Sequence, residues 1–379
     1  MQAADPTTPC LAGRRRARRL RLLALAAVLP STLLICELAV RLLDLGPAPR
    51  PQIHGSVVRP VSDPVLRFVT VPSSERVVVY PPFGRAPRRQ VVQRLNEQGF
   101  RGSALRLPKP CDVLRIVCVG DSHTFGEGVD DSETWPGLLE ARLRGQLSQR
   151  VEVANAGVQG YDTAQEALWL EHFALDLEPD LVLLQFFIND ANGPGRSRPG
   201  ADDGLGWLVR AAHPRQQGLT RWLRQRSRLV DAGLEAVFRR EYFDHWSAGN
   251  ARYLIEDAAA WAEWCAAIAR IDELMAERAV PYAVVLYPMM HAPGGQFASA
   301  PVHRRVAAHL EAEGISYLDA EPAFHASDPT RLRVHPGDLH AGAQANRIFA
   351  DAVAAWLETW EPYTERLVTS PRPASRMRR

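Results

Sequence analysis

The chain has 379 residues, of which 46% are hydrophobic and 23% are charged. These proportions are typical of globular proteins and exclude a wholly disordered or collagen-like chain. The 45 basic and 43 acidic side chains leave a net charge of +2, which gives no reason to expect a nucleic-acid partner. The five cysteines are widely spaced and form no zinc-binding pattern, so we expect neither structural zinc nor a disulfide framework.

The amino-terminal region has the pattern of a membrane anchor. Residues 14–21 contain six arginines, and the 15 residues that follow them, 22–36, carry no charge. As a helix this uncharged run is about 22 Å long, which is shorter than the hydrocarbon core of a bilayer. Apolar residues continue to about Leu45, however, and a helix that extends this far is long enough to span the bilayer.

This pattern also predicts how the chain is oriented. By the positive-inside rule, the basic segment 1–21 stays in the cytoplasm, and the transmembrane helix 22–45 places the rest of the chain in the periplasm. Glu37 and Arg41 are four residues apart and can pair on one face of that helix. A cleaved signal peptide and a lipoprotein processed at Cys36 are the two alternatives.

The rest of the chain divides by composition. Residues 46–111 begin with a proline-rich stretch and continue as short β-like runs, so we expect an extracytoplasmic linker followed by two small strands or a hairpin. Alternating strands and helices over residues 112–362 predict a parallel sheet with helices on both faces. An insertion at 191–250 forms either a lid over a site or plain surface helices. We expect residues 363–379 to form a basic tail.

The strands of this sheet are predicted from continuous apolar runs, which are typical of strands buried on both faces. In chain order, we expect strands over 113–120, 151–157, 180–187, 280–288 and 314–320, and helices near 133–147, 163–175, 251–278 and 343–359. Ligands of such sheets bind beyond the carboxyl ends of the strands. Polar residues at those ends are therefore the candidates for chemistry.

The first two strands end in such candidates. The first strand runs into a Gly-Asp-Ser sequence in which Ser122 would expose its hydroxyl, and its own N–H would lie at a helix start, where it can stabilise an oxyanion. A serine at this position is also a common helix N-cap. The second strand leads into a loop that contains Gly160, and glycine lets backbone approach a ligand closely. Ordinary turn formation explains that glycine equally well.

Two more candidates follow later in the chain. The third strand ends at Asn189, whose side-chain amide is either an oxyanion donor or the start of a loop. Before the last helix, His340 follows Asp338 by two residues, which is a pattern for a general base and the carboxylate that orients it. His335 is the rival base, but it lacks a nearby upstream carboxylate and a following helix.

Together these features resemble the SGNH/GDSL hydrolase superfamily. The family's four blocks are matched by RIVCVGDSHTFGEGVDDSETWPGLLEARL, VEVANAGVQGYDT, LQFFIND and DLHAGAQANRIFADAV. RLNEQGFRG, upstream of the first block, also recurs in membrane-anchored members, so the resemblance covers about residues 94–358. It implies a flavodoxin-like, three-layer α/β/α fold with a five-stranded parallel sheet, preceded here by the expected membrane helix.

The resemblance also implies a role for each site residue. Ser122 would be the nucleophile, His340 the general base and Asp338 the carboxylate that orients the base. The oxyanion hole would consist of the Ser122 N–H, the Gly160 N–H and the Asn189 side chain. The family needs neither a cofactor nor a metal, and we expect none here.

The sequence departs from the family pattern at two positions. Phe187 stands where the third block commonly has glycine, two residues before the asparagine. Asp338 and His340 have one residue between them instead of two, and Gly337 holds the usual place of the aspartate.

Other candidates have weaker support. His123, next to the nucleophile, is expected to face away from the pocket, whereas His291, after the fourth strand, would lie at the active end of the sheet. Trp207, Trp222 and Trp246 in the insertion would form either an acyl or carbohydrate platform or a small core.

The sequence therefore predicts a serine esterase that hydrolyses O-acyl esters, O-acetyl esters among them, of envelope glycans or lipids through an acyl-serine. An O-acyltransferase that passes the acyl group to a sugar hydroxyl and a non-catalytic envelope-binding module are the alternatives. No GxSxG, HExxH, Walker A or GxGxxG motif is present, which excludes α/β-hydrolase, zincin, P-loop and dinucleotide functions. Because the arginines gather at both ends, the body of the chain is acidic, which disfavours nucleic acid as a partner.

Overall fold

The computed structural model describes residues 8–43, 51–82, 86–147, 149–190, 218–234, 254–292 and 295–369. The chain divides into two compact units. The smaller unit combines residues 1–47 with 212–240, and the larger unit combines 48–211 with 241–379.

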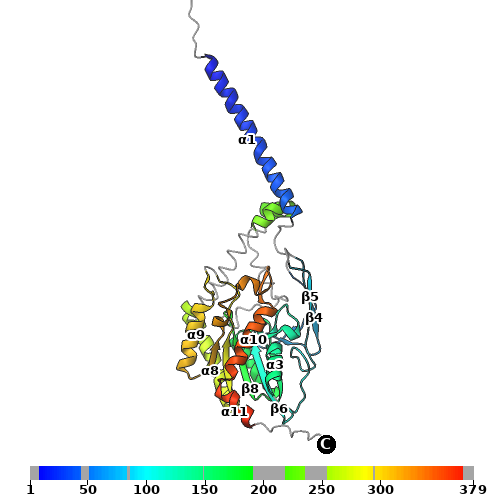
Figure 1. Cartoon of the computed structure of the whole chain (residues 1–379), viewed down its shortest axis with the longest axis vertical. Helices are drawn as coiled ribbons and strands as arrows, with labels where there is room; N and C mark the ends of the chain where they lie inside the picture. Colours follow the sequence, from blue (N-terminus) through cyan, green and yellow to red (C-terminus); the bar gives the residue numbers. More distant parts are fainter. Residues whose placement is uncertain are drawn as a thin grey trace, which may run out of the picture. The chain divides into compact units, whose positions relative to one another are not determined.

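The smaller unit contains helices α1 (Thr8–Leu42) and α6 (Gly218–Arg226). Figure 1 shows α1 as one long helix, so the arginine cluster and the apolar run share a single element rather than meeting at a boundary near residue 21. The helix ends at Leu42, three residues before the predicted end. Across the ranges that the structure describes, no helix combines the length and the apolar character needed to cross a membrane.

Glu37 connects α1 to the described part of the insertion. Its carboxylate pairs with Arg41 at 2.7 Å, as the spacing of four predicts. It also accepts hydrogen bonds from the Ser227 hydroxyl and from the backbone N–H groups of Arg228 and Leu229, at 2.8 and 2.9 Å. These N–H groups open a short helix over 228–234, so Glu37 caps that helix.

The remainder of the insertion lies outside the described residues, and Trp207 and Trp246 lie there too. The described part, 218–234, belongs to the same compact unit as α1. Trp222 is 49% exposed, and the Arg226 guanidinium lies 4.4 Å from its ring centroid.

The larger unit is built on a five-stranded parallel sheet, as predicted. Its strands are β6 (Val113–Gly120), β7 (Arg150–Gly157), β8 (Leu181–Phe186), β9 (Tyr282–Leu286) and β10 (Tyr317–Asp319). Their order across the sheet is β10-β9-β8-β6-β7, which is the flavodoxin-like order. Every residue of β6, β8 and β9 is buried, because helices cover both faces.

The strand order decides which face each helix covers. The principal helices are α3 (Trp135–Gln146), α4 (Thr163–His172), α8 (Ala258–Arg278), α9 (Ala300–Ala312), α10 (Ala343–Leu357) and α11 (Glu361–Thr369). The crossover from β6 to β7 runs in the opposite direction to that from β7 to β8, so right-handed connections place α3 and α4 on opposite faces. Accordingly, α3 packs against α10 (Figure 1), and α4 packs against α8. Because α11 covers 361–369, the predicted tail begins as a helix, and residues 370–379 lie outside the described ranges.

The region predicted as a linker and hairpin forms more β structure than expected. Its strands are β1 (Gln52–His54), β2 (Val58–Pro60), β3 (Phe68–Thr70), β4 (Glu75–Tyr80) and β5 (Arg89–Arg94). Strands β1, β4 and β5 make an antiparallel sheet, and β2 pairs with β3. The prediction missed β5, RQVVQR, because only two of its six residues are apolar.

Short elements complete the larger unit. A hairpin of β11 (Arg333–His335) and β12 (Asp338–Ala341) precedes α10 and was not predicted, because runs of three or four residues show too little periodicity. One-turn elements are α2 (Ser122–Phe125), η1 (Asp131–Glu133), η2 (Ala174–Leu177), η5 (Glu321–Phe324) and η6 (Pro329–Arg331).

Candidate active site

Ser122 lies at the carboxyl end of β6, the strand between β7 and β8. It is the first residue of α2, and the side chain of Asp121 caps this helix by accepting the His123 N–H at 2.8 Å. The Asp121 side chain also accepts the Ser122 hydroxyl at 3.4 Å. The serine is thus held at the edge where ligands of such sheets bind.

Two glycines allow this placement. A Cβ on Gly120, at φ +158°, would collide with the Thr124 hydroxyl, and a Cβ on Gly157 would collide with the Phe125 N–H. The two glycines face each other in the β6–β7 register. Glycine at both positions therefore lets α2 lie directly against the end of the sheet.

The structure brings the three predicted catalytic residues together. The His340 Nε2 is 3.0 Å from the Ser122 Oγ, and the His340 Nδ1 is 2.7 Å from the Asp338 Oδ1. The same carboxylate oxygen accepts the backbone N–H of His340 at 3.0 Å. Asp338 and His340 both belong to β12, where residues two apart share a face. A short strand therefore explains how the chain uses one intervening residue.

Asp338 and His340 each stabilise the charged form of the other. Burial alone would raise the pKa of Asp338 and lower that of His340. The attraction and hydrogen bonds between the two groups oppose this effect. They hold the pKa of Asp338 at about 2 and raise the pKa of His340 to about 9. The pair is therefore arranged to stabilise an imidazolium next to the serine.

The two other predicted oxyanion residues lie at the same sheet edge. Gly160 follows β7 and Asn189 follows β8, the strands on either side of β6. Gly160 has φ +74°, a conformation that favours glycine. Burial raises the pKa of Asp121, while hydrogen bonding by the His123 N–H, and more weakly by the Asn189 side chain, lowers it. Asn189 is thus held beside the residue that caps α2.

Two other histidines, His123 and His335, lie near the triad without belonging to it. His123 is buried, with its ring 3.9 Å from Phe187 and 5.5 Å from His340 between centroids. Burial lowers its pKa well below the ordinary value, so it is neutral. The ring of Phe187 thus fills the space beside the catalytic turn. The rival base, His335, packs against Tyr80 at 5.3 Å and accepts the Gly337 N–H at 3.1 Å.

His291 lies close to this region without being part of the triad. Its Nδ1 is 3.4 Å from the Arg333 guanidinium, which also donates to the Met290 carbonyl at 2.8 Å. Arg333 belongs to β11, the partner strand of β12.

Two further groups at the site were missed by sequence reasoning. The Tyr80 hydroxyl, at the end of β4, donates to the Asp338 Oδ2 at 2.9 Å. Glu127, just after α2, accepts hydrogen bonds from Arg76 and Gln159. The strand sequence ERVVVY has apolar residues on both faces, so it does not mark Tyr80 as inward-facing. Nothing in the sequence relates Tyr80 to an aspartate 258 residues away.

Four buried carboxyl groups, one of them in the catalytic turn, interact electrostatically: Asp121, Asp162, Glu166 and Asp190. Burial and mutual repulsion raise the pKa values of Glu166 and Asp190 well above normal. Within the described ranges, no group of histidine, cysteine, aspartate and glutamate side chains has the arrangement of a metal site.

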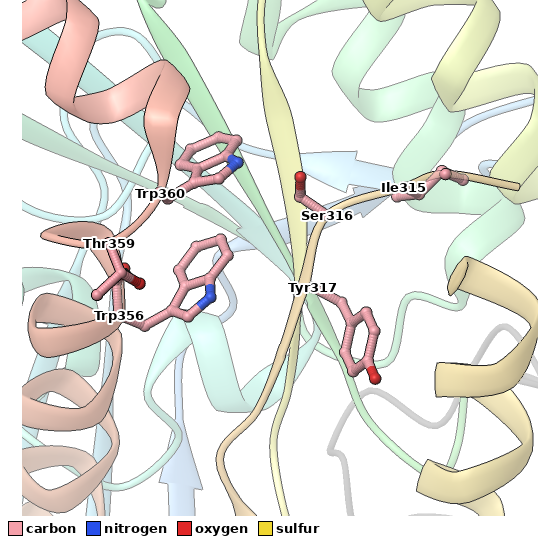
Figure 2. Close-up of a pocket in the computed structure, with 7 residues that line it drawn as sticks. Ile315, Ser316, Tyr317, Trp356, Thr359 and Trp360 are labelled. Carbon is pink, nitrogen blue, oxygen red and sulfur yellow. The ribbon is translucent and has the colours of Figure 1, made fainter. Parts of the chain in front are cut away.

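A separate cavity of about 350 Å³ lies at the amino end of β10. Figure 2 shows Trp356 and Trp360 projecting toward Ser316 and Tyr317, where the chain enters β10. The two indole rings stack with centroids 5.2 Å apart. Because the Ser122 site lies beyond the carboxyl ends of the strands, this cavity is not part of it.

Comparison with known proteins places these features in a family. The sequence profile of the GDSL-like lipase/acylhydrolase family matches residues 118–348. One similar solved structure is a lipolytic protein of the G-D-S-L family from Veillonella parvula, with 14% identity, a TM-score of 0.36, and coverage of 64% of this chain and 97% of that one. No curated protein matches.

Two further similar structures are esterases. A two-domain esterase active on acetylated mannans has 16% identity and a TM-score of 0.36, with coverage of 69% of this chain and 52% of that one. A mutant of an acetyl-xylooligosaccharide esterase from Geobacillus has 16% identity and a TM-score of 0.36, with coverage of 64% and 93%.

Proposed function

Because this chain belongs to the GDSL-like lipase/acylhydrolase family and is a serine hydrolase of ester bonds, we propose that it removes O-acyl groups, O-acetyl among them, from glycans or lipids of the cell envelope. One observation carries the proposal. Ser122, His340 and Asp338 form a continuous chain of hydrogen bonds at the end of the sheet. That arrangement activates a serine for attack on an acyl carbon.

The first half of the reaction acylates the enzyme. His340 takes the proton of the Ser122 hydroxyl as the oxygen attacks the ester carbonyl, and Asp338 stabilises the imidazolium that results. The tetrahedral oxyanion is bound by the Ser122 N–H, the Gly160 N–H and the Asn189 amide. Each such donor contributes about 3–4 kcal/mol to the transition state. His340 then protonates the leaving alcohol as the carbon–oxygen bond breaks, which leaves an acyl-serine.

The second half repeats these steps with water. His340 takes a proton from the water that attacks the acyl-serine, and the same donors bind the second oxyanion. Collapse of that intermediate returns the proton to Ser122 and releases the carboxylic acid. If a sugar hydroxyl replaces the water, the same residues produce an O-acyltransferase.

The catalytic proposal is tested on the full-length protein in a mild detergent. A fluorophosphonate probe should label the wild type, and p-nitrophenyl acetate should be hydrolysed. Ser122→Ala should lose both, whereas Ser316→Ala, at the other end of the sheet, should lose neither. An unlabelled wild type, or a Ser122→Ala variant with normal turnover, refutes the proposal. Adding a glycan acceptor separates hydrolysis from transfer, because transfer gives acylated glycan in excess over free acid.

We also propose that residues 22–45 anchor the chain in the cytoplasmic membrane, with the larger unit in the periplasm. The arginines of 14–21 support this orientation. More than half of the surface is exposed on each of these apolar side chains of α1: Val28, Leu29, Leu33, Leu34 and Ile35. The protein should remain in the membrane pellet after alkaline carbonate extraction, and external protease should digest the larger unit in spheroplasts. Recovery in the carbonate supernatant contradicts the proposal.

A further inference from the structure

We propose that the β4–β5 hairpin positions residues of the active site and is not merely a spacer. In this proposal, which rests on the proposed esterase function, Tyr80 positions the triad acid Asp338. Arg76, from the same strand, positions the loop that carries Gly160. Both are positioning residues, because they act through other side chains.

Tyr80 completes the hydrogen bonding of the triad acid. The Asp338 Oδ1 is occupied by the ring and the backbone N–H of His340. The Tyr80 hydroxyl donates to the other oxygen, Oδ2, at 2.9 Å. The two oxygens thus have donors on opposite sides, which fixes the rotation of the carboxylate about its Cβ–Cγ bond. The direction from which the Asp338 Oδ1 meets the His340 Nδ1 is therefore fixed as well.

The surroundings of Tyr80 fit this role. The side chain is only 1% exposed, and its ring packs against His335 on the neighbouring strand β11. A Cβ at Gly128 would collide with the Tyr80 hydroxyl, so the glycine makes room for it. Burial and the nearby charge of Asp338 raise the pKa of Tyr80 well above its ordinary value. The hydroxyl therefore remains a donor at every pH at which the enzyme works.

Arg76 forms the second connection. Its Nε donates to the Gln93 Oε1 on β5 at 2.6 Å, and its terminal Nη2 donates to the Glu127 Oε2. Glu127 also accepts the side-chain amide of Gln159, the residue before Gly160. Arg76 and Glu127 are both buried, so this ion pair is poorly screened by solvent. The hairpin thus holds the acid with one residue and the oxyanion loop with another.

Tyr80→Phe in the full-length protein tests the first connection. We expect kcat for p-nitrophenyl acetate to fall about tenfold with KM unchanged within twofold. Loss of the donor leaves more negative charge on the carboxylate, so the His340 limb of the pH–rate profile should move to higher pH. The matched control is Tyr282→Phe. That hydroxyl donates to Asp272 at 3.1 Å at the amino end of β9, and its loss should leave kcat and the pH limb unchanged.

Labelling with the fluorophosphonate separates a positioning effect from unfolding. The labelled fraction at saturation counts folded sites, so kcat per labelled site should fall in Tyr80→Phe and stay constant in Tyr282→Phe. Equal values of kcat per site and equal pH limbs in the two variants overturn the role of Tyr80. An inactive wild type overturns the esterase function itself, which distinguishes that failure from this one.

Gln159→Leu tests the second connection. It breaks the link between Glu127 and the oxyanion loop and leaves the Asp338–His340 contact untouched. We expect kcat to fall about fivefold without a shift of the pH limb. The inhibition constant of an alkylboronic acid, which mimics the tetrahedral intermediate, should rise in proportion. If the inhibition constant is unchanged, or if the pH limb moves instead, the role assigned to Arg76 is wrong.

Discussion

Asp338 and His340 leave the same face of a four-residue strand, and their side chains meet at 2.7 Å. Because side chains alternate along a strand, a spacing of two residues is the shortest that places both on one side. The strand thereby compensates for the residue that is missing between acid and base. In an irregular loop, the backbone would not direct the side chains of these two residues to the same side.

Asp338→Asn tests the importance of this pair. The amide removes the charge that stabilises the imidazolium, so we expect kcat to fall by about 10⁴. The pH limb of His340 should move to lower pH, because the carboxylate is what raises its pKa. A steady-state pH–rate series gives both values. Asp319→Asn is the control, since Asp319 contacts another buried histidine, His303, at 2.9 Å. Similar losses in the two variants contradict the assignment of Asp338.

The pH dependence of the wild type follows from the pKa of His340. The general base must be neutral, and the pKa of His340 is raised to about 9. We therefore expect kcat/KM to rise about tenfold per pH unit below that value and to level off above it. Rates of p-nitrophenyl acetate hydrolysis, corrected with Ser122→Ala, measure this. A plateau that is already complete at neutral pH contradicts the raised pKa.

The same shift predicts how stability varies with pH. The folded-state pKa of His340 lies above its unfolded value of about 6.5, so the folded state binds the proton more tightly. The resulting stabilisation is complete below pH 6.5 and is lost as pH rises through about 9. The Tm difference between wild type and His340→Asn should be largest at the acid end of this window and should shrink across it. A difference that is constant with pH contradicts the linkage.

Gly157→Ala tests how tightly α2 packs against the sheet. The added methyl group would collide with the Phe125 N–H, so we expect a loss of about 1–3 kcal/mol in the free energy of unfolding. Because α2 carries Ser122, kcat should fall as well. Gly145→Ala in α3 is the control: nothing lies near the added group, and alanine should stabilise the helix by about 0.5–1 kcal/mol. Thermal unfolding compares the two, and equal Tm changes contradict the prediction.

The sequence alone was sufficient to predict the parallel sheet and the residues that follow the carboxyl ends of its strands. Continuous apolar runs such as VLRIVCVG predict buried strands by themselves, and alternation with helices places their carboxyl ends on one edge. Ser122, Gly160 and Asn189 could therefore be assigned to that edge from their positions after these runs. These inferences depend on local patterns, which a single sequence contains.

The remaining features depend on contacts that no local pattern records. Tyr80 meets Asp338 across 258 residues, and Ser227 meets Glu37 across 190. The hairpin that carries Asp338 and His340 has strands of three and four residues, which are too short for periodicity to be recognised. The buried ring of His123 lies 3.9 Å from that of Phe187 and 5.5 Å from that of His340, measured between centroids, and no local pattern records either contact.

Phe187→Gly restores the residue common in the family at this position, yet we expect it to harm the protein. The Phe187 ring is 4% exposed and lies 3.9 Å from the His123 ring, so its removal leaves a cavity next to the catalytic turn. Deletion of a buried phenylalanine costs about 3–5 kcal/mol, and glycine adds backbone freedom. The Phe187 N–H also donates to Asp190 at 2.8 Å, which ties this segment to the loop of Asn189.

Two measurements on Phe187→Gly separate packing from catalysis. Chemical denaturation should show the loss of stability, and kcat should fall more than KM rises, because a loosened Asn189 affects the transition state more than the bound ester. Phe187→Leu is the control: it keeps most of the apolar volume and should cost no more than about 1.5 kcal/mol. If the glycine variant is as stable as the leucine variant, the space beside His123 collapses without cost. The aromatic ring would then not be what holds the catalytic turn in place.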